Sequence, residues 1–374
     1  MKISVPKEIK NHEYRVGLTP ESVRECTHHG HEVYVQSGAG EGIGSADTEY
    51  IAAGATITPD AETTYAEGTL VIKVKEPQNS ECALLREDHI LFSYLHLAPD
   101  PEQTRDLIAS KAVCIAYETV TSPEGGLPLL APMSKVAGRM AVQAGAYCLE
   151  HPHGGLGMLL GGVPGVDPAK VVIIGGGVVG THATHIAVGM GADVWIIDRS
   201  MSVIEKHWQQ FGRSTNTVFS TQQALERHVL EADLVIGSVL IPGAAAPKLV
   251  SKEMVKAMKP GSVIIDVAID QGGCFETSRP TTHAEPTYIV DDVVHYCVTN
   301  MPGGVPRTST FALNNATLPH ILTLADNGWK KALLEDEHLM AGLNICQGHV
   351  TNQPVASNLD YRYNDPKNIL RAKS

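Results

Sequence analysis

The stretch that decides the fold is Val171-Val-Ile-Ile-Gly-Gly-Gly-Val-Val-Gly180. Its four apolar residues predict a short buried strand, and a helix-like run over 181–191 follows it. Between the strand and the helix, Gly175, Gly177 and Gly180 fit the G-x-G-x-x-G pattern of a dinucleotide-binding turn.

Each of the three glycines has a physical role in such a turn. Gly175 permits the sharp turn out of the strand, Gly177 lets a pyrophosphate approach the backbone, and Gly180 lets the helix pack closely on the sheet. The N-terminus of the helix offers unpaired N–H groups and a partial positive charge to the phosphates. We therefore expect a dinucleotide to bind at this turn.

An acid at the end of the next strand predicts which dinucleotide binds. The run Asp-Val-Trp-Ile-Ile-Asp over 193–198 reads as the second strand and ends at Asp198. A carboxylate there accepts hydrogen bonds from the adenosine ribose 2′-OH and repels a 2′-phosphate, so it favours NAD over NADP. Arg199 weakens that preference slightly, and the expected cofactor is NAD.

Length, charge and cysteine usage limit the class of protein. A chain of 374 residues suggests two domains, because single cores rarely grow beyond about 300 residues. The net charge of −12 argues against a nucleic acid or an anionic membrane as partner. The sequence has no apolar run of membrane-spanning length and no apolar signal-peptide region at its N-terminus. Seven scattered cysteines without a C-x-x-C motif indicate reduced, mostly buried thiols in a cytoplasmic protein.

Strand-like runs alternate with helical segments in both halves of the chain. In the first half they lie at 3–5, 32–36, 69–74, 89–94 and 112–117. In the second half they lie at 171–174, 193–198, 215–219, 233–237, 262–267 and 287–290. Alternation of this kind predicts an α/β fold in which mostly parallel sheets are covered by helices on both faces.

Two long helices are predicted where this alternation stops. The first covers 133–150, and its small residues on one flank let another helix approach closely. These small residues are Ala137, Gly138, Ala141, Ala144 and Gly145. The second long helix covers 311–327, a further helix is predicted at 329–340, and no strand pattern follows residue 310.

We expect two doubly wound, Rossmann-like domains joined by the two long helices around a cleft. The predicted domain boundaries are 1–130 with 305–374 for a discontinuous substrate domain, and 131–304 for the NAD-binding domain.

Ligands of open α/β sheets bind beyond the carboxyl ends of the strands. Ionisable residues at these ends are therefore the candidates for chemistry, and they are Arg15, Lys75, His96 and Asp270. Arg15 can hold a carboxylate by two parallel hydrogen bonds, and Lys75 adds a second positive charge. His96 can exchange a proton near neutral pH, and Asp270 can stabilise a cationic amine or activate water. If the two sheets face each other, these four side chains converge beside the nicotinamide.

Each of these residues also has a purely structural explanation. Arg15 fits a solvated loop residue, and Lys75 fits an ion pair with Glu76 or another neighbour. His96 lies between apolar residues, which is more typical of a core histidine. Asp270 precedes two glycines and fits a turn residue that bonds its own backbone.

Metal and thiol chemistry are not expected. His182 and His185 are spaced for one helix face but lack an apparent third ligand. The pair His151 and His153 fits a loop better than a metal site. The cysteines lack the electropositive, base-paired setting that a nucleophilic thiol needs.

Five further motifs are long enough to be specific for one family. They are Pro6-Lys-Glu8 with Arg15-Val-Gly-Leu-Thr-Pro20, Gly38-Ala-Gly-Glu-Gly-Ile-Gly-Ser-Ala-Asp-Thr-Glu-Tyr50, Val74-Lys-Glu-Pro77, Ala131-Pro-Met-Ser-Lys-Val-Ala-Gly-Arg139 and His295-Tyr-Cys-Val-Thr-Asn-Met-Pro-Gly303. Together they resemble the NAD-dependent alanine dehydrogenases, nearly from end to end. The wider family includes the NAD-binding subunit of nicotinamide nucleotide transhydrogenase. Two small departures are Lys135, where a glutamate is usual, and Gly304, where an alanine is usual.

The resemblance implies an activity and a set of site residues. L-Alanine would be oxidatively deaminated to pyruvate and ammonium, reversibly, with NAD as cofactor and a homohexamer as the assembly. Arg15 and Lys75 would bind the substrate, and His96 and Asp270 would form the acid–base pair. The residues that would line the cofactor are Ser134, Gly175, Gly177, Val178, Gly180, Asp198, Ser220, Val239, Leu240, Val267, Asp270, Val298, Asn300 and Met301.

The mechanism implied by these roles passes through an iminium. The neutral amine loses its Cα hydride, a water activated by His96 or Asp270 adds to the iminium carbon, and the carbinolamine releases ammonia. Two other functions fit part of the same pattern. A transhydrogenase NAD subunit is disfavoured because no membrane-spanning tail follows, and a non-catalytic NAD-binding regulatory protein is disfavoured by the four candidate catalytic residues.

Overall fold

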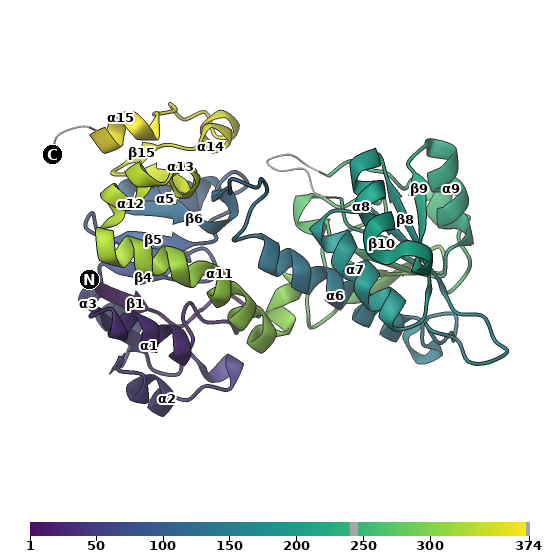
Figure 1. Ribbon diagram of the computed structural model, residues 1–374, viewed down its shortest axis with the longest axis horizontal. Helices are drawn as coiled ribbons and strands as arrows, with labels where there is room; N and C mark the ends of the chain where they lie inside the picture. Colours follow the sequence, from purple (N-terminus) through teal and green to yellow (C-terminus); the bar gives the residue numbers. More distant parts are fainter. Residues whose placement is uncertain (240–245, 372–374) are drawn as a thin grey trace. The chain divides into compact units, whose positions relative to one another are not determined.

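The structure, a computed structural model, describes residues 1–239 and 246–371 (Figure 1). The chain forms two compact units: unit 1 comprises Met1–Met133 and Gly303–Ser374, and unit 2 comprises Ser134–Pro302. The chain leaves unit 1 inside helix α6 (Ala131–Cys148) and returns to it just before helix α11 (Pro306–Asn327).

Unit 1 is built on a sheet that has eight strands among the described residues, in the order β15-β14-β6-β5-β4-β1-β2-β3. These strands are β1 (Lys2–Val5), β2 (Glu32–Gln36), β3 (Thr56–Thr58), β4 (Leu70–Ile72), β5 (Ile90–Ser93), β6 (Val113–Ala116), β14 (Leu343–Cys346) and β15 (His349–Val350). Strands β1 to β6 are parallel, whereas β14 pairs antiparallel with both β6 and β15. Val71 of β4 lies opposite Ser4 of β1 and Leu91 of β5. The loops that follow β1, β4 and β5 therefore leave the sheet at one edge.

Most helices of unit 1 lie between its strands in the chain, and the last two come after the final strand (Figure 1). Helix α1 begins as predicted, because the Thr19 side chain accepts a hydrogen bond from the Ser22 N–H and Pro20 occupies the first turn. Helix α1 spans Pro20–His28. Besides α1 and α11, the helices of unit 1 are α2 (Asp47–Ala52), α3 (Ala61–Glu67), α4 (Asn79–Cys82), α5 (Pro101–Ser110), α12 (Trp329–Glu335), α13 (Glu337–Met340), α14 (Gln353–Asn358) and α15 (Pro366–Arg371).

Unit 2 is built on a sheet that has seven strands among the described residues, in the order β12-β13-β11-β10-β7-β8-β9. The strands are β7 (Lys170–Ile174), β8 (Asp193–Asp198), β9 (Asn216–Phe219), β10 (Leu234–Gly237), β11 (Val263–Asp266), β12 (Thr287–Val290) and β13 (Val293–Tyr296). The helices are α6, α7 (Val178–Gly189), α8 (Met201–Phe211), α9 (Gln222–Glu231) and α10 (Lys252–Lys256). All strand pairs are parallel except that of β12 with β13.

The core of unit 2 has one layer on each face of this sheet. In β7, Val171 and Ile173 pack in one hydrophobic cluster, and Val172 and Ile174 pack in the other. Because both faces are buried, the strand reads as an unbroken apolar run. The two mostly parallel sheets with intervening helices confirm the predicted α/β fold class.

The close approach of another helix that was predicted for the small residues of α6 is found at Gly138, whereas Gly145 faces strand β10. A Cβ built on Gly138 would lie 2.2 Å from the carbonyl oxygen of Val179 in α7. A Cβ on Gly145 would lie 2.6 Å from the side chain of Leu234 in β10. Helix α6 therefore packs on the rest of unit 2 at a distance that only glycine allows at these positions.

The prediction that no strand follows residue 310 is wrong. Strands β14 and β15 extend the sheet of unit 1 beyond β6. Their sequence signal is weak because β14 has only four residues, all buried, and β15 has two. A short buried strand shows no polar–apolar alternation.

Smaller differences concern one predicted helix and two further strands. The predicted helix at 329–340 is interrupted at Asp336, whose side chain accepts hydrogen bonds from the His338 and Leu339 N–H groups and so begins a new helix. Strands β3 and β13 were not among the predicted runs.

Among the helices that the structure describes, none is both long and apolar enough to span a membrane.

Candidate functional site

Arg15 lies in the loop after β1 and is buried, with 2% of its surface exposed. Its Nε and Nη2 donate to Glu13 Oε1 and Oε2 at 2.7 and 2.5 Å, and its backbone N–H also donates to Glu13 Oε1. Nη1 lies 3.0 Å from the sulfur of Met133. Burial acts to lower the pKa of Arg15, but the paired Glu13 carboxylate outweighs it and the pKa is raised. The solvated-loop explanation of Arg15 is therefore wrong.

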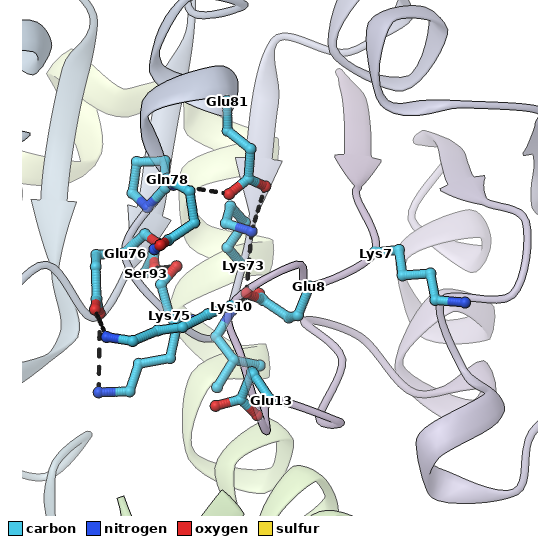
Figure 2. A network of polar contacts seen from close by, with 12 residues as sticks. Lys7, Glu8, Lys10, Glu13, Lys73, Lys75, Glu76, Gln78, Glu81 and Ser93 are labelled. Atoms are coloured by element: carbon cyan, nitrogen blue, oxygen red, sulfur yellow. Dashed lines mark hydrogen bonds and ion pairs between the residues drawn. The ribbon is translucent and has the colours of Figure 1, made fainter. Parts of the chain in front are cut away.

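Lys75 lies three residues beyond the end of β4 and is largely buried, with 13% of its side chain exposed. Its Nζ is 3.8 Å from Glu76 Oε2, and Lys10 makes an ion pair with the other oxygen of Glu76 (Figure 2). Burial acts to raise the pKa of Glu76, but the two lysines outweigh it, so the pKa is lowered. The structural explanation of Lys75, an ion pair with Glu76, is present in the molecule.

A buried cluster of charged residues lies near Lys75 (Figure 2). Lys73 Nζ donates to Glu8 Oε2 at 3.0 Å and to Glu81 Oε1 at 2.7 Å. The side chains of Lys73, Glu8 and Glu81 are 0%, 2% and 3% exposed. Burial raises the pKa of Glu8 to about 7, against the opposing effect of Lys73. We call Glu8, Lys73 and Glu81 the buried triad.

His96 lies beyond the end of β5, with 43% of its side chain exposed. Its backbone has a left-handed φ of 49°, and its ring stacks on Tyr94 with centroids 5.9 Å apart and planes 6° from parallel. Glu118 Oε1 accepts the His96 backbone N–H at 2.7 Å and lies 3.9 Å from Nδ1. The core-histidine explanation is therefore wrong, because His96 presents much of its ring to the surface of unit 1.

In unit 2, the turn after β7 has the geometry that its glycines predicted. Gly175 has a φ of +99°. A Cβ on Gly180 would lie 1.9 Å from the carbonyl oxygen of Gly175, so this side of α7 touches the turn itself. A Cβ on Gly177 would meet no heavy atom of the described residues within 4 Å. The space beside Gly177, at the start of the twelve-residue helix α7, is open to a ligand.

Asp198 ends β8 and is only partly buried, beside the same turn. Its Oδ2 accepts the Gly176 N–H at 2.7 Å, and its Oδ1 accepts the Ser200 N–H at 2.8 Å. Each carboxylate oxygen has two lone pairs, so both retain capacity for a ribose hydroxyl. Asp198 therefore holds the glycine turn in place and suits the ribose role as well.

Asp270 is exposed and lies in the short 3₁₀ turn Ile269–Gln271, four residues beyond the end of β11. The loop that carries it is closed by Asp266, a fully buried acid. Asp266 accepts the N–H groups of Ala268 and Cys274 at 3.1 and 2.9 Å and the hydroxyl of Ser278 at 2.6 Å. Asp270 therefore lies in a turn and is accessible.

The remaining expected cofactor residues are distributed over unit 2. Val178 is exposed, Ser134, Ser220, Val239, Val267 and Asn300 are partly buried, and Val298 and Met301 are buried. Leu240 lies outside the described residues. Ser220 donates its backbone N–H to the Asp198 carbonyl at 2.9 Å, so it adjoins the expected ribose position. All seven cysteines are buried without a disulfide, as expected, and burial raises the pKa of Cys148 to about 11.

Sequence analysis missed several polar residues that adjoin the candidates. Glu118 lies just beyond β6, so the strand-end rule applied there would have found it. Glu8 and Glu81 gave no signal, because an isolated glutamate in a loop or at a helix start is usually exposed. Lys73 reads as part of the strand β4. Only the folded chain reveals that these acids meet a buried lysine.

The fold and the glycine turn define a protein of two α/β units, of which the second has the Rossmann-type dinucleotide-binding architecture. Residues 4–137 match the family model described as Alanine dehydrogenase/PNT, N-terminal domain. Residues 141–353 match the model described as Alanine dehydrogenase/PNT, C-terminal domain. The chain belongs to the alanine dehydrogenase/PNT family.

Relatives from distant organisms support this assignment over the full chain. Alanine dehydrogenase of Halomonas elongata is 58% identical, over 99% of this chain and 100% of the relative. The enzymes of Methanococcus maripaludis and Mycolicibacterium smegmatis are 52% and 51% identical over the same shares of each chain. A solved L-alanine dehydrogenase superposes with a TM-score of 0.93 at 50% identity, covering 96% of this chain and 99% of that one. A solved transhydrogenase from Sinorhizobium meliloti has a TM-score of 0.83 at 24% identity over 94% of this chain and 100% of that one, and shares the fold.

Proposed function

We propose that this protein catalyses the NAD-dependent oxidative deamination of L-alanine to pyruvate and ammonium, and the reverse reductive amination. The observation that carries the proposal is identity of 50–58% with proteins named alanine dehydrogenase along nearly the whole chain. The transhydrogenase function has less support, because the likeness to the solved transhydrogenase is a likeness of fold at 24% identity.

Arg15 and Lys75 have the charges needed to bind the substrate carboxylate and its neighbouring carbonyl or amine. The Nε–Nη2 edge of Arg15 is bonded to Glu13. Glu13 already fixes the orientation of the buried guanidinium. Binding of the substrate therefore costs less free energy for ordering this side chain than it would for a solvated arginine.

His96 and Asp270 are assigned to proton transfer. Both are exposed within their own units, and an acid–base residue must reach the substrate and a water. As the Cα–H bond breaks, the amine nitrogen forms the C=N bond of an iminium. Water then adds to Cα and yields its proton to His96 or Asp270. The nitrogen is then protonated, and the C–N bond breaks as the hydroxyl oxygen forms the C=O of pyruvate. The hydroxyl proton passes to the departing ammonia, which leaves as ammonium.

The residues around the glycine turn fit NAD. When bound, NAD accepts the hydride from the alanine Cα. The open space beside Gly177 and the N-terminus of α7 suit the pyrophosphate, and the partly exposed Asp198 carboxylate suits a ribose hydroxyl. Asp198 would repel a 2′-phosphate, so NADH should be preferred to NADPH.

The proposal is tested by NADH oxidation in the presence of ammonium and a panel of 2-oxo acids that includes pyruvate and glyoxylate. We expect turnover to be fastest with pyruvate, to require ammonium, and to fall strongly when NADPH replaces NADH. Binding of NADH without turnover on any of these acids would support a regulatory protein instead.

We also propose that the protein works as a homo-oligomer in the cytoplasm. The buried free thiols suit a reducing compartment, and the family resemblance suggests a hexamer. Light scattering coupled to gel filtration measures the mass of the assembly. A monomer by that measurement would exclude the oligomer.

A further inference from the structure

The buried triad joins two segments that carry the proposed substrate residues. Glu8 belongs to the loop after β1, which continues to Arg15, and Lys73 belongs to the segment after β4, which continues to Lys75. The third member, Glu81, begins α4, where its Oε2 accepts the Gln78 N–H at 2.9 Å. The triad is thus an ionic connection between the two loops at one edge of the sheet (Figure 2).

Burying three charged groups needs an explanation other than stability. Desolvation of buried ions commonly cancels their attraction, so apolar residues of similar volume often give a protein of equal or greater stability. The ordinary value of buried charge is that it fixes one arrangement of the groups that it touches. The question is therefore which groups the triad fixes.

One carboxylate oxygen of Glu8 accepts hydrogen bonds from the backbone at Lys75 and at the residue before it. Glu8 Oε1 accepts the N–H of Val74 at 2.7 Å and that of Lys75 at 3.4 Å. Strand β4 ends at Ile72, so these two N–H groups lie beyond its strand pairing with β1. The Glu8 carboxylate occupies the position that a neighbouring strand would otherwise take.

The other backbone group of Lys75 is held as well. The hydroxyl of Ser93, at the end of β5, donates to the Lys75 carbonyl at 2.9 Å. Side chains from the two neighbouring strand ends thus bond the N–H and the C=O of Lys75. A loop residue held at both groups has its Cα fixed, so its side chain needs little reorganisation to meet a ligand.

We propose that Glu8 is a positioning residue that fixes the backbone of Lys75, and that Lys73 holds Glu8 in the orientation for this role. This inference rests on the proposed function of Lys75 in substrate binding. Glu8 itself touches no substrate. Its effect is on the affinity for the 2-oxo acid, because NADH binds to unit 2.

Glu8→Gln and Glu8→Gln/Lys73→Met test the proposal as a pair. In Glu8→Gln, the amide places an NH2 group against either the Lys73 ammonium or the Val74 N–H, so a donor always faces a donor. In the double variant the ammonium is absent, and the introduced amide can accept from Val74 while its NH2 donates to Glu81. At pH 8, above the raised pKa of Glu8, the wild-type carboxyl is ionised. At this pH we expect KM for pyruvate to rise about tenfold in Glu8→Gln and to return to within about threefold of wild type in the double variant. KM for NADH should change by less than about twofold in both.

Hydrogen exchange measures the same effect without activity. Amide exchange of the peptide containing Val74 and Lys75 should be faster in Glu8→Gln than in wild type and slower again in the double variant. Glu67→Gln is the matched control, because it removes a carboxylate from an exposed ion pair of the same unit and should change neither reading. Ser93→Ala removes the bond to the Lys75 carbonyl and, with it, the contact of the same hydroxyl with the Tyr94 carbonyl at 3.0 Å. It should raise KM for pyruvate about threefold, and it provides the test if Glu8→Gln does not fold.

Three results would overturn the proposal. They are a folded Glu8→Gln protein with the wild-type KM for pyruvate, an equal rise in KM for pyruvate and NADH, and unchanged exchange at residues 74 and 75. A wild-type protein that has no turnover with pyruvate and ammonium would overturn the proposed function instead. The hydrogen-exchange comparison would still decide whether Glu8 holds the loop.

Discussion

Backbone N–H groups beyond the ends of β4 and β7 need hydrogen-bond partners, and the two strand ends meet this need in opposite ways. At β7, the backbone of a glycine turn is exposed by the absence of side chains, as the open space beside Gly177 shows. At β4, the backbone beyond the strand is held by a buried glutamate, which is itself held by a buried lysine. The first site offers N–H groups to a ligand, whereas the second consumes them internally and leaves a side chain, Lys75, for the ligand.

The difference teaches what each kind of site requires from the rest of the chain. A glycine turn is made of neighbouring residues, and Asp198, which accepts its Gly176 N–H, follows at the end of the next strand. Ser238 and His207 bond the carbonyl groups of the turn from farther along the chain. The arrangement at β4 requires Glu8 from the loop after β1 and Glu81 from helix α4. The following experiments would break or sharpen this contrast, in order of decreasing expected effect.

Gly180→Ala should have the largest effect. The new Cβ would lie 1.9 Å from the Gly175 carbonyl oxygen, so the turn must open or the helix must move. Overpacking of this kind costs about 3 kcal/mol, and NADH affinity should fall about a hundredfold or more. Fluorescence titration with NADH and a thermal melt measure the two effects.

Gly177→Ala is the matched control for that prediction. Its Cβ would meet no described heavy atom within 4 Å. The melting temperature should therefore remain at the wild-type value, while NADH binding weakens through contact with the ligand alone. If both variants had the wild-type melting temperature and the wild-type NADH affinity, the absence of side chains at these glycines would not be needed for NADH binding.

Asp266→Asn tests whether unit 2 also depends on a buried acid. The amide keeps one acceptor oxygen, so one of the three donors that Asp266 accepts loses its partner, at a cost of about 2 kcal/mol. Because the loop carries Asp270, we expect kcat to fall about tenfold while KM for pyruvate stays constant. The exposed Asp291→Asn is the control. A normal kcat in a folded Asp266→Asn protein would remove this loop from the comparison.

The pH dependence of stability tests the charge state of the triad. Burial raises the pKa of Glu8 from 4.5 to about 7, against Lys73 and with Glu81 and Glu13 adding to the rise. The folded protein then binds a proton that the unfolded chain releases, so the free energy of unfolding falls as pH rises from about 4.5 through 7. The loss attributable to Glu8 is on the order of 2–3 kcal/mol.

Chemical denaturation of wild type and Glu8→Gln at several pH values between 5 and 8 measures this loss. The wild-type protein should lose stability relative to the variant across that window, because a glutamine side chain does not titrate. Parallel profiles would mean that Glu8 carries its charge throughout and that the triad is fully ionised.

Tyr94→Phe should have the smallest effect. The Tyr94 hydroxyl donates to the Leu129 carbonyl at 2.6 Å, and its loss should destabilise the protein by about 1 kcal/mol. The ring that stacks on His96 remains, so kcat should stay within about twofold of wild type. Tyr94→Ala removes the ring too, and a kcat that is equally unaffected there would exclude the stack as a support of His96.

Much of unit 2 could be predicted from its sequence, because the determinants of its site are local. The strand β7, the turn, the helix and Asp198 follow one another with the spacing of a single βαβ unit. Their positions in the structure match that expectation. In unit 1, the strand-end rule found Arg15, Lys75 and His96, yet nothing in the sequence showed that Arg15 is buried against Glu13.

What could not be predicted depends on tertiary contacts between segments far apart in the chain. The partners of Lys73 are Glu8 in the loop after β1 and Glu81 in helix α4. A glutamate gives no sequence signal of burial. Strands β14 and β15 were not predicted for a related reason. The four residues of β14 pair with the edge of β6, and the two residues of β15 pair with β14 in turn.

The late position of β14 in the chain has a consequence for biosynthesis. During translation, all of unit 2 emerges from the ribosome before residues 343–350 have been made. Unit 2 can fold as soon as it emerges, whereas β6 waits as an unpaired edge that other chains can join. The nascent protein is therefore most exposed to aggregation, and most in need of a chaperone, during the interval between the synthesis of β6 and that of β14.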